Sequence, residues 1–284
     1  MRTLSTYLLL FFLLCSCSNH GQLTYVAKLP KKLNENSGLV SYVENSAWAI
    51  EDSGNGDNIY KISFQGKILK KLEVKNAKNK DWEDLTKDDQ GNLYIGDFGN
   101  NRNDRKELTI YKLQNPEEEA GEKIAADKIE FSYPEQKDFP PHKSERVFDA
   151  EAFFYYDGHL YIFTKNRADP FTGETTLYKV PAKKGNYKAE FLGKLKTCSD
   201  WDTCKVTSAD ISEDGKKIVL LGSGKLWVIT AFSSDNFTKG KLQEIDLGTL
   251  TQLESVCFID KNTLLLSDEQ TGSEGRNLYS YTLK

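Results

Sequence analysis

The stretch Asp81-Trp82-Glu83-Asp84-Leu85, followed at once by residues 86–101, contains the pattern that decides the fold. Acidic residues lead into a short apolar strand, Asp89-Gln90-Gly91-Asn92 forms a turn, and a second apolar strand, Leu93-Tyr94-Ile95, runs into the polar loop Gly96-Asp97-Phe98-Gly99-Asn100-Asn101. Two apolar runs separated by a turn that contains Gly and Asn are typical of a β-hairpin.

The same pattern occurs four more times, in units that begin at Asn34, Asp149, Thr207 and Leu253. Each unit continues with a third strand in which an aromatic residue follows an aliphatic one: Ile59-Tyr60, Ile110-Tyr111, Leu177-Tyr178, Leu226-Trp227 and Leu278-Tyr279. A fourth strand follows in four units, over residues 68–74, 128–133, 189–195 and 242–247. The last unit has none, and residues 23–29 can supply it.

Four-stranded units that recur at roughly 45 to 70 residues predict an all-β fold, a β-propeller. We expect five four-stranded blades, the last closed by the N-terminal strand. Six blades are the alternative, which would need a cryptic repeat within residues 114–147. No linker is visible, so residues 23–284 are expected to form a single domain, with the long excursion 134–146 lying across one face.

Composition and charge exclude some functions. The net charge of −4 leaves no basic stripe for a nucleic acid. The three histidines lie in a tether, a Pro-rich excursion and a hairpin turn, so no His-centred triad or zinc site is expected. We expect a monomer whose ligand is a small molecule, a glycan or a protein.

The N-terminus has the pattern of an export signal. Residues 1–17 contain Arg2, an apolar run from Tyr7 to Leu14, and the sequence Leu14-Cys15-Ser16-Cys17. This ending resembles a lipoprotein cleavage box with Cys17 as the lipidated residue, and a plain secretory signal is the alternative. Residues 18–22 would be a tether, and a lipid would be the only membrane anchor, with the protein facing the periplasm.

Cysteines of an exported protein are candidates for disulfides. Cys198 and Cys204 flank the loop-like sequence Ser199-Asp200-Trp201-Asp202-Thr203, which suits a local disulfide. Cys257 lies among apolar residues and is interpreted as a buried, unreactive thiol.

Antiparallel strand order places the polar start of each first strand and the polar end of each second strand at one mouth of the central channel. The first ring supplies the candidate metal ligands Glu83, Asp84, Glu151, Asp210 and Glu254. The second ring comprises Glu51, Asp52, Asp97, Asn100, Asn101, Asn166, Arg167, Asp268 and Glu269.

Carboxylates gathered in a narrow funnel repel one another unless a cation lies among them. Oxygen ligands without His or thiolate favour Ca²⁺ as the cofactor. A purely structural acidic ring and a metal-free site for a cationic or hydroxyl-rich ligand are the alternatives. If the protein is an enzyme, Glu83, Glu151 and Glu254 are the catalytic candidates. Trp82 and Trp201 either stack on a ligand at the mouth or pack between blades.

The units led by Glu83-Asp84-Leu85, Glu151-Ala152-Phe153 and Glu254-Ser255-Val256 resemble the SdiA-regulated family of exported bacterial propellers. More loosely, the chain is similar to phytase-like propellers, and Trp82-Glu83-Asp84-Leu85 with Gly96-Asp97-Phe98-Gly99-Asn100-Asn101 resembles lipoproteins of Bacteroidetes. The resemblance implies a calcium-dependent propeller in the cell envelope. The lysine-rich phosphate site of propeller phytases has no counterpart here. We therefore expect a cation-binding lipoprotein with an unidentified ligand, or alternatively a calcium-dependent hydrolase of a phosphoester, lactone or glycan.

Overall fold

The structure, a computed structural model, describes residues 19–284. The predicted signal segment and Cys17 lie outside the described residues. Within the described part, no helix has the length and apolar character needed to cross a membrane.

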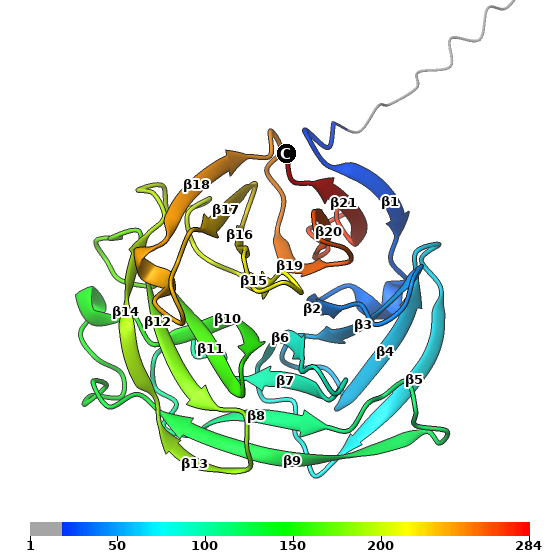
Figure 1. The fold of residues 1–284 in the computed structure, drawn as a ribbon, viewed down its shortest axis with the longest axis horizontal. Helices are drawn as coiled ribbons and strands as arrows, with labels where there is room; N and C mark the ends of the chain where they lie inside the picture. The colour runs from blue at the N-terminus through cyan, green and yellow to red at the C-terminus, as the bar shows by residue number, and fades with distance from the viewer. Residues whose placement is uncertain (1–18) are drawn as a thin grey trace, which may run out of the picture.

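The strands form five blades around a central axis (Figure 1). Blade 1 contains β2 (Asn36–Val40), β3 (Ser46–Glu51), β4 (Asn58–Ser63) and β5 (Ile68–Lys75), and blade 2 contains β6 (Trp82–Lys87), β7 (Leu93–Asp97), β8 (Leu108–Leu113) and β9 (Lys123–Ser132). Blade 3 contains β10 (Asp149–Tyr156), β11 (His159–Lys165), β12 (Glu174–Pro181) and β14 (Glu190–Lys196), and blade 4 contains β15 (Ser208–Ile211), β16 (Ile218–Gly222), β17 (Lys225–Thr230) and β18 (Lys241–Asp246). Blade 5 contains β19 (Leu253–Phe258), β20 (Thr263–Asp268), β21 (Asn277–Thr282) and β1 (Thr24–Lys28).

The predicted fold class is confirmed, with five blades rather than six. Strand β1 pairs with β21 in antiparallel fashion, so the N-terminal strand closes the last blade as expected. The innermost strands β2, β6, β10, β15 and β19 contact one another in ring order, and β19 returns to contact β2.

An apolar core lies at each of the five blade boundaries. The aromatic residue of each third strand is buried in one of these cores: Tyr60, Tyr111, Tyr178, Trp227 and Tyr279. The aromatic residue of the repeated aliphatic–aromatic pair therefore packs one blade against the next.

The outer strands of blades 1 and 2 also pair with strands outside their own blades. Residues Glu73–Lys75 of β5 pair in parallel with Lys123–Ala125 of β9, and β13 (Gly185–Lys188) pairs in parallel with Ile129–Ser132 of the same strand. Strand β9 thus begins five residues before the sequence pattern predicts, because its first residues pair with the neighbouring blade. We call β5, β9 and β13 the outer belt.

The described residues also contain three 3-10 helices, η1 (Lys31–Leu33), η2 (Lys143–Glu145) and η3 (Phe237–Lys239). Helix η2 belongs to the predicted excursion. Its backbone carbonyls at Lys143 and Arg146 accept hydrogen bonds from Asp169 and Arg167, so the excursion packs where the second strand of blade 3 ends.

Candidate functional site

The inner strands of four blades begin with a β-bulge, and its extra residue is Ser37, Glu83, Glu151 or Glu254. A bulge turns its extra residue out of the regular pairing of the strand. Three glutamates therefore have the same place in three different blades, at the end of the channel where the inner strands begin. We call this end the mouth.

The acidic cluster of the mouth is formed by Asp52, Asp81 and Glu83. One carboxylate oxygen from each residue lies within 4.8 Å of those of the other two. Asp52 follows β3 in blade 1, while Asp81 and Glu83 lie at the start of β6 in blade 2. Two neighbouring blades thus bring three carboxylates together.

Glu83 is the most deeply buried member of the acidic cluster. Its side chain is only 7% exposed. Burial, followed by repulsion from Glu151 and Asp52, raises the pKa of Glu83 well above its usual range. A buried carboxylate surrounded by other carboxylates is an unstable arrangement unless a proton or a cation joins it.

Gly99 makes room for these carboxylates. A Cβ at this position would overlap an Oε of Glu83 and an Oδ of Asp81. The loop after β7 can therefore close over the acidic cluster only because residue 99 is glycine. The polar loop singled out in the sequence supplies the wall of the cluster rather than its ligands.

The acids of blade 3 are neutralised by two cations. Arg167 donates to Asp149 (2.6 Å) and to Glu151 (2.8 Å), and Lys165 also pairs with Glu151. The Lys165 Nζ lies 4.0 Å from Glu254 of blade 5. Lys165 and Arg167 are thus already occupied by partners and leave the acidic cluster unpaired.

Several other carboxyls of the mouth lose their protons at a higher pH than usual. The pKa is raised to about 6 for Asp81, to about 7 for Asp149 and Glu254, and to about 8 for Glu269. In each case burial is the largest cause, and neighbouring carboxylates add to it.

Asp84 and Asp210, predicted as metal ligands, lie apart from the acidic cluster. Asp84 accepts hydrogen bonds from the backbone N–H groups of Phe153 and Ala209 and from Ser208 Oγ, so it links blades 2, 3 and 4 at the axis. Asp210 accepts from Phe258 N at 2.8 Å. Because backbone donors satisfy both carboxylates, these residues hold inner strands together.

The misplacement of Asp210 has a simple geometric cause. Ser208 pairs with Leu221, as Asp84 pairs with Gly96, so the residue equivalent to Asp84 is Ser208 rather than Asp210. Strand β15 has no bulge, and the alignment based on acidic residues is shifted by two positions.

Trp82 does not face the mouth. It is fully buried in the core between blades 1 and 2. Its indole N–H donates to the carbonyl of Lys78. Of the two predicted roles, Trp82 therefore has the second, packing between blades. Trp201 is 43% exposed.

Most residues of the predicted second ring have structural partners. Asp97 pairs with Arg105, Asn100 donates to Phe148 O, Asn166 donates to Glu174 O, and Asp268 accepts from Thr251, Asn277 and Tyr279. Glu51 is buried and pairs with Lys32 at 2.7 Å. Asn101 is exposed. Only Asp52, Arg167 and Glu269 of this ring belong to the charged groups of the mouth.

Sequence reasoning missed four residues of the mouth: Asp81, Asp149, Lys165 and Lys205. A signal for Lys165 exists, because it occupies the position that Asp52 and Glu269 hold in blades 1 and 5, one residue after the strand position shared by Thr164, Glu51, Asp97 and Asp268. A lysine among equivalent acids indicates local neutralisation. Asp81 has a signal as well, because it lies two residues before the bulge residue, where blades 1 and 3 carry Glu35 and Asp149.

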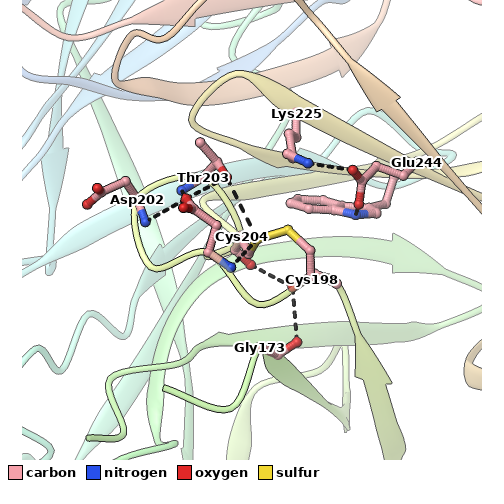
Figure 2. The surroundings of a disulfide bond; sticks show 10 residues. Gly173, Cys198, Asp202, Thr203, Cys204, Lys225 and Glu244 are labelled. Carbon is pink, nitrogen blue, oxygen red and sulfur yellow. Dashed lines mark hydrogen bonds and ion pairs between the residues drawn. A yellow bond between two sulfur atoms is a disulfide. The ribbon is translucent and has the colours of Figure 1, made fainter. Parts of the chain in front are cut away.

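Cys198 and Cys204 form a disulfide with a Cα–Cα distance of 5.3 Å (Figure 2). The loop between them is tied further, since Asp200 Oδ1 accepts from Thr203 N and Thr197 Oγ1 donates to the carbonyl of Gly173. Cys257 is a buried free thiol. A cavity of about 310 Å³ lies beside this loop, between blades 4 and 5 and away from the acidic cluster, lined by residues that include Thr203, Lys225 and Leu250.

Comparison with protein-family models gives no match, and comparison with curated proteins gives none. Among solved structures, the PQQ-bound aldose sugar dehydrogenase from Streptomyces coelicolor matches with a TM-score of 0.52 and 11% identity, over 92% of this chain and 98% of that one. The shared feature is the fold.

Two further structures match less well. One is a gluconolactonase from Xanthomonas campestris, with a TM-score of 0.46 and 11% identity over 88% of this chain and 72% of that one. The other is a catalytically inactive virginiamycin B lyase from Staphylococcus aureus, with a TM-score of 0.44 and 14% identity over 90% of this chain and 69% of that one.

Proposed function

We propose that this protein is a propeller of the cell envelope that binds a divalent cation, Ca²⁺, at Asp52, Asp81 and Glu83. The observation that carries the proposal is Glu83, a buried carboxylate whose oxygen lies within 4.8 Å of two other carboxylates. This site replaces the predicted ring of five ligands by three residues from blades 1 and 2.

The charge and chemistry of the cluster favour a hard cation. All three side chains offer oxygen, and the nearby Lys165 and Arg167 are engaged with Asp149 and Glu151. Calcium accepts six to eight oxygen ligands in flexible geometry, so carboxylates, backbone carbonyls and water can complete its coordination. Magnesium requires a stricter octahedron. Binding of either ion would relieve the repulsion that raises the pKa values of the cluster.

The envelope assignment is supported by the sequence of residues 1–17 and by the likeness of the repeats to SdiA-regulated and Bacteroidetes lipoproteins. We propose that Cys17 carries the lipid and that the propeller faces the periplasm. Labelling of cells with a radioactive fatty acid would incorporate label into the wild type but not into Cys17→Ala.

Glu83→Gln is expected to weaken Ca²⁺ binding at least tenfold, because it removes one negative charge and one ligand oxygen from a buried site. Isothermal titration of the chelator-treated mature protein measures the affinity. Melting provides a second readout, since a ligand that binds only the folded state raises its stability by RT ln(1 + [L]/Kd).

Glu213→Gln is the matched control, because Glu213 is exposed in the turn between β15 and β16. It should bind Ca²⁺ as the wild type does, and MgCl₂ should bind less tightly than CaCl₂. A wild type that shows neither heat of binding nor a melting shift with Ca²⁺ would overturn the proposal, as would unchanged affinity in Glu83→Gln.

A hydrolase that depends on the same cation is the second candidate. Glu254 favours it, because its pKa of about 7 suits a general acid or base at neutral pH. Glu151 is paired with two cations and Glu83 is assigned to the cation, so Glu254 is the one catalytic candidate left for proton transfer. Calcium-dependent hydrolysis of gluconolactone or p-nitrophenyl phosphate that is lost in Glu254→Gln would establish this function.

A further inference from the structure

Lys205 lies in the loop that precedes β15, directly after the disulfide-bonded Cys204 (Figure 2 shows this loop). Its Nζ is 4.2 Å from the ring centroid of Trp201, which itself contacts Phe171 edge to face at 5.4 Å. A cation above an indole ring is attracted to it, so Trp201 orients the lysine. The disulfide and the hydrogen bonds of Asp200 hold Trp201 in place.

The ammonium group of Lys205 has no counterion. Among residues 19–284, it makes no ion pair within 4.0 Å, although the side chain is half-buried. The pKa of Lys205 lies below its usual value, first because of burial and then because Lys165 and Arg167 repel its charge. These two cations have carboxylate partners, whereas Lys205 does not.

The charges of the mouth are separated by blade. Blades 1, 2 and 5 contribute acids that have no paired cation or only a distant one: Asp52, Asp81, Glu83, Glu254 and Glu269. Blade 3 contributes Lys165 and Arg167, whose charges are balanced by Glu151 and Asp149, and blade 4 contributes the unbalanced Lys205. The mouth therefore has an acidic side and a cationic side.

We propose that Lys205 binds the anionic group of the ligand, an oxyanion of the carboxylate or phosphate type. An ammonium is a compact point charge that binds such oxygens well, and a half-buried one benefits most from a counterion. The indole of Trp201 positions the amine. The assignment rests on the proposed function in one respect, since it uses the same mouth as the ligand-binding face.

Three probes test the assignment by isothermal titration of the oxidised protein: inorganic phosphate, gluconate and neutral glucose. The wild type should bind phosphate or gluconate more tightly than glucose. Lys205→Met keeps the length of the side chain and removes its charge, and it should lower the affinity for the bound anion at least tenfold. Lys205→Arg should stay within about threefold of the wild type.

Lys216→Met is the control, because Lys216 is exposed in the turn between β15 and β16, and it should bind the anion as the wild type does. Phosphate binding without gluconate binding would assign the site to phosphates, and the converse to carboxylates. Failure of both anions to bind, or equal binding by the wild type and Lys205→Met, would overturn the proposal.

Separate titrations with CaCl₂ and with chelator distinguish this failure from that of the cation proposal. Anion binding that persists without Ca²⁺ and depends on Lys205 supports the anion site even if Ca²⁺ does not bind. Normal Ca²⁺ binding together with absent anion binding would reject Lys205 and leave the cation site intact.

Discussion

At the scale of single residues, Asp84 shows how a carboxylate can be structural in a place where it looks functional. It is fully buried at the axis and accepts hydrogen bonds from three neighbouring residues in blades 3 and 4. Burial nevertheless raises the pKa of Asp84 well above its usual range, and the hydrogen bonds that it accepts offset this effect only in part. This residue joins blades that are far apart in sequence.

Asp84→Ala is expected to destabilise the protein by about 2–4 kcal/mol, because the substitution leaves buried donors of Phe153, Ala209 and Ser208 without an acceptor. Urea unfolding followed by tryptophan fluorescence measures the change. Asp89→Ala, at an exposed turn position, should shift stability by less than about 0.5 kcal/mol. An equally small effect of Asp84→Ala would mean that its hydrogen bonds contribute nothing.

The sequence identifies the residue types of the mouth better than their roles. The place of Glu83 before an apolar strand predicts a metal ligand, and Glu83 is one of the three residues of the acidic cluster. The partners of Asp84 and Asp210 come from other blades, so no local pattern reveals them. The role of a carboxylate depends on which donors the fold brings to it, and those donors are backbone groups that every sequence contains.

At the scale of elements, the inner strands differ in how closely they approach one another. Gly38 of β2 occupies the position of Asp84 in β6, as their pairings beside the bulges show. A Cβ on Gly38 would lie 2.9 Å from Leu85 N and 3.0 Å from the carbonyl carbon of Asp84. Strand β2 therefore reaches β6 only because it has no side chain there.

Gly38→Ala should cost about 1–3 kcal/mol, because β2 and β6 must separate to admit the methyl group. The measurement is again the urea midpoint. Gly121→Ala serves as the control, since its nearest neighbour is the movable end of the Glu119 side chain. A wild-type midpoint in Gly38→Ala would show that the inner ring adjusts without cost.

Strand positions are well predicted where hydrophobic alternation sets them and less well where other elements extend them. The five third strands fall where the aliphatic–aromatic pairs indicate. The parallel pairings of the outer belt could not be predicted, because Lys123–Ala125 and Gly185–Lys188 are short, each with one large apolar residue, and pair with strands outside their own blade. Such pairing depends on tertiary proximity, which the local pattern does not encode.

At the scale of the whole molecule, the fold follows from repetition, while the distribution of charge around the mouth does not. Five similar units can close into a ring only as a propeller, and the missing strand of the last unit identifies β1 as its partner. The cationic side of the mouth arises from Lys165, Arg167 and Lys205, which interrupt the repeat instead of following it.

The carboxyls of the mouth should make the chelator-treated protein less stable as pH rises from about 4 to 8. The pKa values of Asp81, Asp149, Glu254 and Glu269 are raised to between about 6 and about 8. The folded state then holds more protons than the unfolded state in this interval, and that difference makes stability decrease with pH.

Glu269→Gln tests this sign with one residue. The variant and the wild type should be equally stable near pH 4, and the variant should gain about 1 kcal/mol or more over the wild type by pH 8, where the pKa of Glu269 lies. Urea midpoints at pH 4, 6 and 8 give the profile, with Glu213→Gln as a control that shows no trend. A wild type that gains on Glu269→Gln with rising pH would contradict the raised pKa.

The closure of blade 5 has a mechanical consequence. Thr24 pairs with Ser280 and Lys28 pairs with Asn277, so both ends of the chain leave the blade at the same edge. Tension between the two termini would separate β1 from β21 one hydrogen bond at a time, rather than breaking all of these hydrogen bonds together. Tension between the N-terminus and a ligand held at the mouth would pass through the blades, and the pairing of β1 with β21 would be the first contact to separate.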